Sequence, residues 1–281
     1  MVTYKDIVQL PPPPAGIRIA YADNALAFGD LRLPENQLQD NRLHPLAVVI
    51  HGGCWQGEND LAHAAHASAA LTAIGIATWT IEYRRIGNAG GGWTGTFDDV
   101  AAGADFVRVL AQRFPLDLNR VVFVGHSAGG HLALWLAARR NLPLQGPLCR
   151  REPFEPRGVV SLAGITDLRA FGAVSGYCND SVAELLGGKP DQVPERYALT
   201  SPIELLPSPS MQRIVHGNPD TVVPLEQSQS YVERALAVGS NVHLLVLESV
   251  GHFDLIAPFS SAWPHIKEII LKLLGEAADR N

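Results

Sequence analysis

The sequence predicts an α/β fold in which helices cover both faces of a mostly parallel, doubly wound sheet. The chain has 281 residues, 47% of them hydrophobic, which is enough to bury one large core. From residue 46 onward, short apolar runs alternate with longer segments of helical composition. Continuous apolar runs are typical of strands buried on both faces, and their alternation with helices indicates parallel strands joined by crossovers.

The predicted elements follow one another in a regular order. Two short strands come first, at residues 17–21 and 26–31. The apolar run at 46–50 is the first buried strand, and an Ala-rich helix follows it at 61–74. The remaining elements are strand 76–81, helix 97–114, strand 121–124, helix 130–140, strand 159–162, strand 213–215, helix 225–238, strand 243–247 and helix 262–274.

Two segments depart from this rhythm within what we expect to be a single domain, residues 1–281. Residues 1–16 end in four consecutive prolines, which predicts an extended arm on the surface. Residues 166–209 contain several glycines and prolines and no strand–helix alternation. We interpret this second segment as an excursion over the carboxyl edge of the sheet that forms a small cap or pocket wall.

Charge and cysteine content exclude several classes of function. The net charge of −6 is spread along the chain without a basic cluster, which argues against nucleic-acid or anionic-membrane partners. The three cysteines, Cys54, Cys149 and Cys178, are far apart and match neither a zinc motif nor a dense disulfide framework. We find no signal peptide and no run of about 18 apolar residues. We therefore expect a cytoplasmic protein without metal or cofactor, and the sequence is compatible with a homodimer.

The stretch VGHSAGGHLA places Ser127 where a predicted strand joins a predicted helix. Gly125 and Gly129 flank the serine, and larger side chains there would collide with neighbouring backbone. This is the G-x-S-x-G elbow, which exposes a serine at the carboxyl end of a sheet. The helix that follows directs its free amides and positive dipole end toward the serine.

A serine hydroxyl becomes a good nucleophile only when a base removes its proton and an acid orients that base. In this architecture the chain order is serine, acid, histidine. Asp220 in IVHGNPDTVVP and His252 in ESVGHFDLIAP each follow a predicted strand, so they should lie at the same edge as Ser127. Asp167 is the reserve acid. We expect His63 and His66 to be surface or packing residues and His216 to have a structural role in a turn. Local geometry should point His126 and His131 away from the serine hydroxyl.

Acyl transfer also requires donors for a developing oxyanion, each worth about 2.7–4 kcal/mol. The loop in VVIHGGCWQG follows the first buried strand, and its glycines allow amides to face a cleft. We assign the amides of Gly53, Cys54 and Ala128 as oxyanion donors. The Cys54 side chain is expected to fill space only. Trp55 and Phe253 are candidates for substrate binding, with core packing as the alternative for each.

The motifs HGGCW, EYRR, GHSAGGHLA, HGNPDTVVP and GHFD, in this order, resemble the α/β-hydrolase superfamily. The chain is similar to the branch that contains kynurenine formamidase-like enzymes, small carboxylesterases and catalytic domains of the prolyl-oligopeptidase type. The likeness extends from about residue 46 to about residue 274. It implies a triad of Ser127, Asp220 and His252, and the same three oxyanion donors. Formamidase-like members commonly carry an aromatic residue where this chain has Cys54.

The expected function is that of a metal-independent serine hydrolase that cleaves a small carboxylic ester or amide through an acyl-enzyme. An ester is favoured over an amide. The alternatives are an arylformamidase acting on N-formylkynurenine, an aminopeptidase-like amide hydrolase, and an acyltransferase using the same residues. A non-catalytic ligand-binding protein on the same frame is the alternative from another class. The expected partner in every case is a small molecule.

Overall fold

A computed structural model describes residues 1–35 and 42–275. It contains an eight-stranded sheet in the order β1-β2-β4-β3-β5-β6-β7-β8. The strands β3 to β8 all run parallel, whereas β1 and β2 form an antiparallel edge and β2 is antiparallel to β4. The predicted fold class is confirmed. The strands are β1 (Ile17–Ala20), β2 (Phe28–Arg32), β3 (His44–Ile50), β4 (Ala77–Ile81), β5 (Leu116–His126), β6 (Gly158–Leu162), β7 (Met211–Gly217) and β8 (Val242–Leu247).

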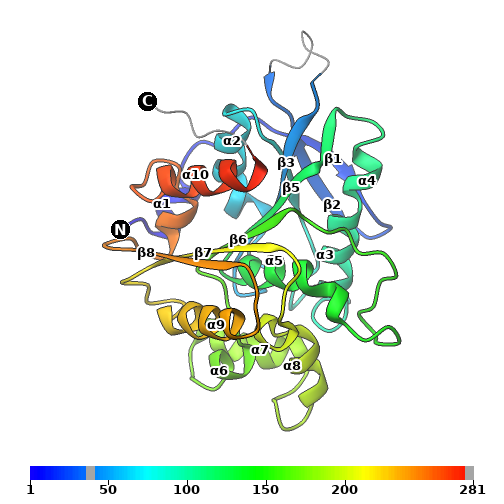
Figure 1. The fold of residues 1–281 in the computed structure, drawn as a ribbon, viewed down its shortest axis with the longest axis vertical. Helices are drawn as coiled ribbons and strands as arrows, with labels where there is room; N and C mark the ends of the chain where they lie inside the picture. The colour runs from blue at the N-terminus through cyan, green and yellow to red at the C-terminus, as the bar shows by residue number, and fades with distance from the viewer. Residues whose placement is uncertain (36–41, 276–281) are drawn as a thin grey trace.

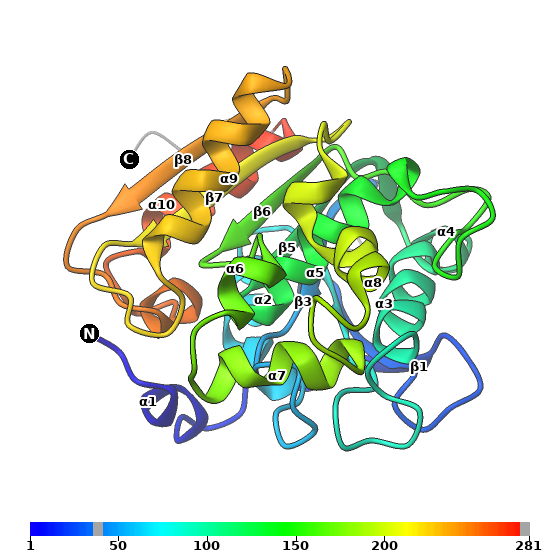
Figure 2. The same ribbon diagram turned by 90° about the horizontal axis from the view of Figure 1, so that it is seen from below.

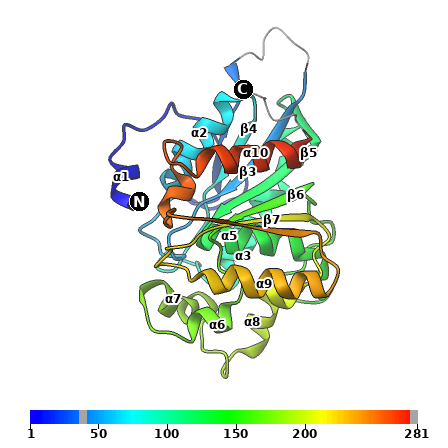
Figure 3. The same cartoon turned by 60° about the vertical axis from the view of Figure 1, so that its left-hand side comes forward.

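Helices cover both faces of this sheet (Figure 1). On one side lie α2 (Ala65–Ala73) and α10 (Trp263–Leu274), and on the other lie α3 (Gly95–Asp105), α5 (Ala128–Ala138) and α9 (Leu225–Ala237), as Figure 3 shows from another direction. Strand β3 contributes to two cores, because successive side chains of a strand point to opposite faces. Val48 belongs to the core beneath α5, and Val49 belongs to the core beneath α10.

The first sixteen residues are not extended throughout, so that expectation is wrong for part of the arm. Tyr4–Val8 form a short helix, α1. Its first turn is closed by a capping box, in which Thr3 and Asp6 bond each other's backbone amides. Ile7 is fully buried in the core beneath α10. The four prolines predict an extended arm, whereas the capping box of Thr3 and Asp6 ahead of them starts a helix.

The excursion between β6 and β7 folds into α6 (Leu168–Gly172), α7 (Tyr177–Leu186), α8 (Pro194–Thr200) and a 3-10 turn, η4 (Pro202–Leu205). Figure 2 shows α6, α7 and α8 grouped together, and Figure 3 shows this group on the opposite side of the sheet from α2 and α10. The predicted helix 97–114 is divided, because α3 ends at Asp105 and a separate short helix, α4 (Val107–Leu110), follows it. No helix in the described part of the chain is both long and apolar enough to cross a membrane.

Candidate active site

Ser127 occupies the turn between β5 and α5, as predicted. Its backbone has φ 56° and ψ −122°, a conformation that a non-glycine residue adopts only when its surroundings hold it there. A Cβ at Gly125 would lie 2.0 Å from the carbonyl oxygen of Gly129, and a Cβ at Gly129 would lie 2.1 Å from that of Ile50. Both glycines are therefore required by close backbone approach, which confirms the steric argument made from the sequence.

Asp220 and His252 come together although 32 residues separate them. The distance from His252 Nδ1 to Asp220 Oδ2 is 2.7 Å. A carboxylate only accepts hydrogen bonds, so Nδ1 carries the proton and Nε2 is the nitrogen left to act as a base. Asp220 follows β7 and His252 follows β8, which are neighbouring parallel strands. Each member of the pair thus lies just beyond the carboxyl end of one of these two strands.

The carboxylate of Asp220 is fully buried and well supplied with donors. Burial alone would raise its pKa, but the hydrogen bond from His252 and those from two amides outweigh burial and lower the pKa below its ordinary value. The two amides are those of Val222 and Val223, 2.8 and 2.9 Å from Oδ1. Asp220 is therefore held as an anion beside the imidazole.

Two buried histidines, which we did not expect to take part in the site, support the loop after β8 that carries His252 (the His252 loop). His126 Nε2 lies 2.9 Å from the carbonyl oxygen of His252, and His63 Nε2 lies 2.8 Å from His126 Nδ1. The rings of His126 and His252 have centroids 4.4 Å apart. Burial lowers the pKa of His126 well below 6.5, and the neighbouring His252 and His63 lower it further. Both supporting imidazoles are therefore neutral.

The structure brings Ser127 beside this arrangement without joining it to His252. Ser127 is the immediate neighbour of His126, and its amide donates to the carbonyl oxygen of Leu162 over 2.8 Å. Within residues 1–35 and 42–275, no residue hydrogen-bonds to Ser127 Oγ or to His252 Nε2. Contacts of this kind are often long before substrate binds. The serine–histidine contact stays a prediction.

The predicted oxyanion loop follows β3 and passes directly against the elbow. A Cβ at Gly52 would lie 2.8 Å from the carbonyl oxygen of His126. The loop turns through positive φ at Gly53 (109°), Cys54 (53°) and Trp55 (58°). No described residue accepts a hydrogen bond from the amides of Gly53, Cys54 or Ala128, the first residue of α5. These three amides remain the candidate oxyanion donors.

A buried ionic network lies under the predicted oxyanion loop. Glu82 accepts from Arg85 and from the amides of Tyr83 and Leu61, and one of its oxygens lies 3.2 Å from His51 Nε2. The Tyr83 hydroxyl donates to the carbonyl oxygen of His51 over 2.8 Å. All of these side chains are nearly or fully buried, so the network fixes the start of the loop in one conformation.

Cys54 is joined to Cys178 by a disulfide, which corrects the expectation that its side chain only fills space. The two cysteines are 124 residues apart, and an odd count of three gave no pairing signal. Cys149 is the free cysteine among the described residues. The carboxylate of Asp167, the reserve acid, caps α6 through the amides of Arg169 and Ala170, and among the described residues no histidine hydrogen-bonds to it.

The two candidate substrate-binding residues differ in their surroundings. Trp55 is fully buried, and its indole Nε1 donates to His131 Nδ1 over 3.2 Å, which corresponds to the core-packing alternative. Phe253 is partly buried and packs edge-on against His252, with ring centroids 5.0 Å apart.

Among the described residues, no group of three or more histidine, cysteine or carboxylate side chains is arranged to hold a metal ion.

A comparison with protein-family models adds a decisive observation. The model of the BD-FAE family matches residues 30–235, most of the chain, and this range includes Cys54, Ser127 and Asp220. The chain belongs to the BD-FAE family. Membership, together with the eight-stranded sheet, places this BD-FAE protein in the α/β-hydrolase superfamily, as the sequence motifs predicted.

Two curated proteins are similar in sequence to this BD-FAE member. "Esterase LipC" of Mycobacterium tuberculosis (strain ATCC 25618 / H37Rv) is 28% identical over 218 residues, which cover 75% of this chain and 54% of LipC. "Isoprenylcysteine alpha-carbonyl methylesterase ICME" of Arabidopsis thaliana is 24% identical over 250 residues, 84% of this chain and 56% of that protein. The chain spans about half the length of these relatives.

Solved structures share the fold at low sequence identity. A truncated carbohydrate esterase from gut microbiota has a TM-score of 0.79 and 22% identity, with 94% of this chain and 98% of that chain covered. Esterase B from Lactobacillus rhamnosis has a TM-score of 0.80 and 17% identity, with 95% and 89% covered. Thermogutta terrifontis esterase 2, phosphonylated by sarin, has a TM-score of 0.76 and 18% identity, with 95% and 96% covered. At these identities the likeness establishes the fold.

Proposed function

We propose that this chain is a carboxylesterase-type serine hydrolase that cleaves a small carboxylic ester. One observation carries the proposal: the imidazole of His252 is hydrogen-bonded over 2.7 Å to a buried, ionised Asp220, next to a serine at a strained strand–helix turn. An oriented imidazole beside such a serine is the arrangement that acyl transfer requires. The esterase names of the two sequence relatives favour an ester over an amide.

In the proposed reaction, Ser127 Oγ attacks the acyl carbon while His252 Nε2 takes the hydroxyl proton. Asp220 holds Nδ1–H, so the imidazole presents Nε2 and its positive charge is stabilised once it forms. The protonated His252 then gives its proton to the leaving alkoxide. Water repeats the sequence on the acyl-enzyme, with His252 again as the base, and releases the carboxylate product.

The negative charge of each tetrahedral intermediate would be met by backbone amides. The amides of Gly53 and Cys54 approach from the loop after β3, and that of Ala128 from the start of α5. None of them is committed to a described acceptor, and the dipole of α5 favours an anion at this end. Since backbone amides donate whatever the side chain is, cysteine at position 54 is compatible with the role.

The arylformamidase and aminopeptidase alternatives are not proposed, because the comparisons give them no support. The cytoplasmic location, the homodimer and the role of residues 166–209 as a pocket wall stay predictions. A substrate panel of p-nitrophenyl esters from acetate to longer acyl chains, with N-formylkynurenine included, would define the acyl preference. We expect turnover of the short esters.

A fluorophosphonate probe tests the proposal directly. We expect intact-mass analysis to show one adduct on the protein and none on Ser127→Ala, together with loss of p-nitrophenyl acetate hydrolysis in that variant. Ser230→Ala is the matched control, because Ser230 is exposed on α9, and it should label and turn over like the unmodified protein. Absence of labelling on folded protein, or labelling that persists in Ser127→Ala, would overturn the proposal.

A further inference from the structure

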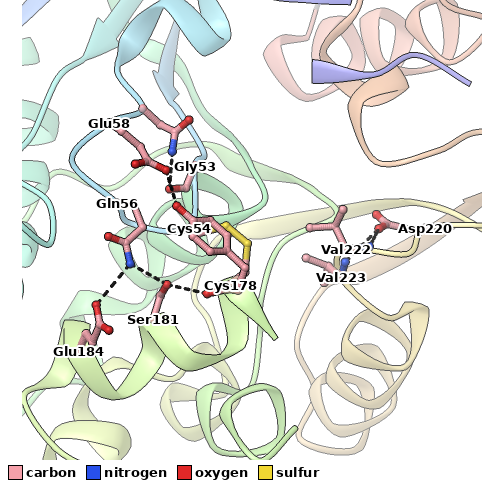
Figure 4. Close-up of a disulfide and its surroundings, with 12 residues drawn as sticks. Gly53, Cys54, Gln56, Glu58, Cys178, Ser181, Glu184, Asp220, Val222 and Val223 are labelled. Carbon is pink, nitrogen blue, oxygen red and sulfur yellow. Dashed lines mark hydrogen bonds between the residues drawn. A yellow bond between two sulfur atoms is a disulfide. The ribbon is translucent and has the colours of Figure 1, made fainter. Parts of the chain in front are cut away.

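A covalent link connects the oxyanion loop to the excursion between β6 and β7. Cys54 lies in the loop after β3, and Cys178 lies in the first turn of α7, with their Cα atoms 4.9 Å apart (Figure 4). Each cysteine is 9% exposed, so the disulfide lies just beneath the surface. It closes a loop of more than one hundred residues that contains the nucleophile elbow.

Polar contacts reinforce the disulfide on both sides. The side-chain amide of Gln56 donates to Ser181 Oγ over 2.9 Å and to Glu184 Oε2 over 3.4 Å (Figure 4). The Tyr177 hydroxyl donates to Glu58. The α7 partners are residues 177, 178, 181 and 184, a spacing that places them along one side of the helix. One side of α7 is thus fastened to residues 54–58.

Residues 54–58 include the part of the oxyanion loop in which non-glycine residues have positive φ. Cys54 and Trp55 both have positive φ, which costs free energy in a non-glycine residue and persists only when other contacts enforce it. The indole of Trp55 is anchored in the core by His131. The Cys54 amide belongs to the same peptide group as the carbonyl of Gly53, which accepts from the amide of Gln56 over 2.9 Å and from Asn59 Nδ2 over 3.2 Å. Among the described residues, the bond to Cys178 is the covalent restraint on the Cys54 side chain. The disulfide therefore adds to these hydrogen bonds in restraining the residue whose amide would donate to the oxyanion.

We propose that Cys178 is a positioning residue: through the disulfide, it holds the Cys54 amide in its donor orientation, and turnover therefore depends on the redox state of this pair. The inference rests on the proposed function. A small dithiol reductant opens the link by thiol–disulfide exchange, in which Cys54 and Cys178 each gain a proton and one electron and the dithiol becomes its own cyclic disulfide. Among the described residues, the hydrogen bonds from Gln56 and Tyr177 then remain between the oxyanion loop and α7.

The kinetic test uses Cys178→Ser, which removes the link and leaves Cys54 in place. An oxyanion donor acts on the transition state more than on bound substrate, so we expect kcat for p-nitrophenyl acetate to fall about 10-fold, with KM changed less than about twofold. Complete loss of one oxyanion donor would lower kcat by about 10²–10³-fold. Treating the unmodified protein with dithiothreitol should lower kcat equally, and reoxidation should restore it. Cys178→Ser itself should not respond to dithiothreitol.

Cys149→Ser is the matched control, because it removes the free cysteine and leaves the pair intact. It should keep full activity and the full response to dithiothreitol. Alkylation by iodoacetamide in denaturant should modify one cysteine in the oxidised protein and three after reduction. Three modified cysteines in the oxidised protein, or equal kcat in the oxidised and reduced forms, would overturn the inference.

A readout independent of turnover separates this inference from the proposed function. Hydrogen–deuterium exchange should become faster on reduction in peptides covering residues 53–58 and 177–186, and stay unchanged in residues 225–237 of α9. Faster exchange without any esterase activity would refute the proposed function and leave the restraint established. Unchanged exchange in both segments would refute the restraint, whatever the activity.

Discussion

The imidazole of His126 donates a hydrogen bond from Nε2 to the carbonyl oxygen of His252, across 2.9 Å. A carbonyl only accepts, so this bond assigns the tautomer of His126 and leaves its Nδ1 to accept from His63 Nε2–H, 2.8 Å away. The residue that precedes the proposed nucleophile therefore supports the backbone of the proposed base. The elbow and the His252 loop are coupled through a side chain that has no direct role in the proposed chemistry.

Replacing His126 should impair both stability and turnover. In His126→Phe the carbonyl of His252 and the Nε2–H of His63 lose their partners, and each unsatisfied buried group costs about 1–3 kcal/mol. We expect a lower urea midpoint and a fall in kcat of about 10-fold as the His252 loop loosens. His243→Gln, an exposed substitution on β8, is the control and should match the unmodified protein in both measurements. An unchanged kcat in folded His126→Phe would show that the support is not needed.

Acidification should begin to destabilise the fold at a pH above the range in which carboxylates titrate. Burial lowers the pKa of His51 and of His63 to about 3 and that of His131 to about 4, from an ordinary value of 6.5. Below pH 6.5 these histidines bind protons in the unfolded chain but stay neutral in the folded protein. The free energy of unfolding therefore falls as the pH drops from about 6.5 to about 4. Each such histidine contributes a slope of about 1.4 kcal/mol per pH unit.

Urea unfolding at pH 7, 6 and 5 measures this slope. His131→Gln should reduce it by the contribution of one histidine, whereas His243→Gln should leave it unchanged. A free energy of unfolding that is flat between pH 6.5 and 5 would contradict the assignment of these histidines as buried and neutral.

Asp220→Asn should nearly abolish turnover while preserving the fold. The amide cannot hold His252 in the same tautomer or stabilise its charged form, so we expect kcat to fall by about 10³–10⁴-fold. Asp167→Asn is the matched control, since Asp167 follows β6 and caps α6. Its activity should stay within about twofold of the unmodified protein. Equal losses in the two variants would remove the basis for choosing Asp220 as the acid.

Removing Glu82 should strongly destabilise the protein. In Glu82→Ala the buried guanidinium of Arg85 loses its carboxylate, and breaking a buried pair typically costs about 3–5 kcal/mol. The urea midpoint should therefore fall sharply. Glu268→Ala is the comparison, because Glu268 pairs with Lys272 on the exposed surface of α10 and its loss should leave the midpoint in place. Similar midpoints for the two variants would mean that the Glu82 network does not stabilise the loop.

The sequence was sufficient to predict the sheet and the loops that carry the candidate residues. Continuous apolar runs located β3 and β5, and the strand–turn–helix pattern located Ser127. Asp220 and His252 were identifiable because each follows a strand whose carboxyl end had to face the same edge. Their hydrogen bond is the strongest agreement between the sequence analysis and the structure.

Features that depend on tertiary distance were not accessible from the sequence. The His63–His126 contact joins residues from a 3-10 turn and a strand 63 positions apart, and no periodicity marks it. The Cys54–Cys178 bond depends on where α7 settles, and residues 166–209 contain no repeating pattern from which to place that helix. The helix α1 was missed because four prolines nearby gave a stronger local signal than Thr3 and Asp6.

The excursion between β6 and β7 also divides the proposed machinery in two. The proposed nucleophile and the proposed oxyanion donors precede the excursion in the chain. The proposed acid and base follow it. The two portions meet in the sheet through the β6–β7 pairing, from Gly158 opposite Met211 to Leu162 opposite Val215. A chain cut within residues 187–193 would thus yield two inert fragments, and recovery of hydrolysis on mixing them would report on the reassembly of the sheet itself.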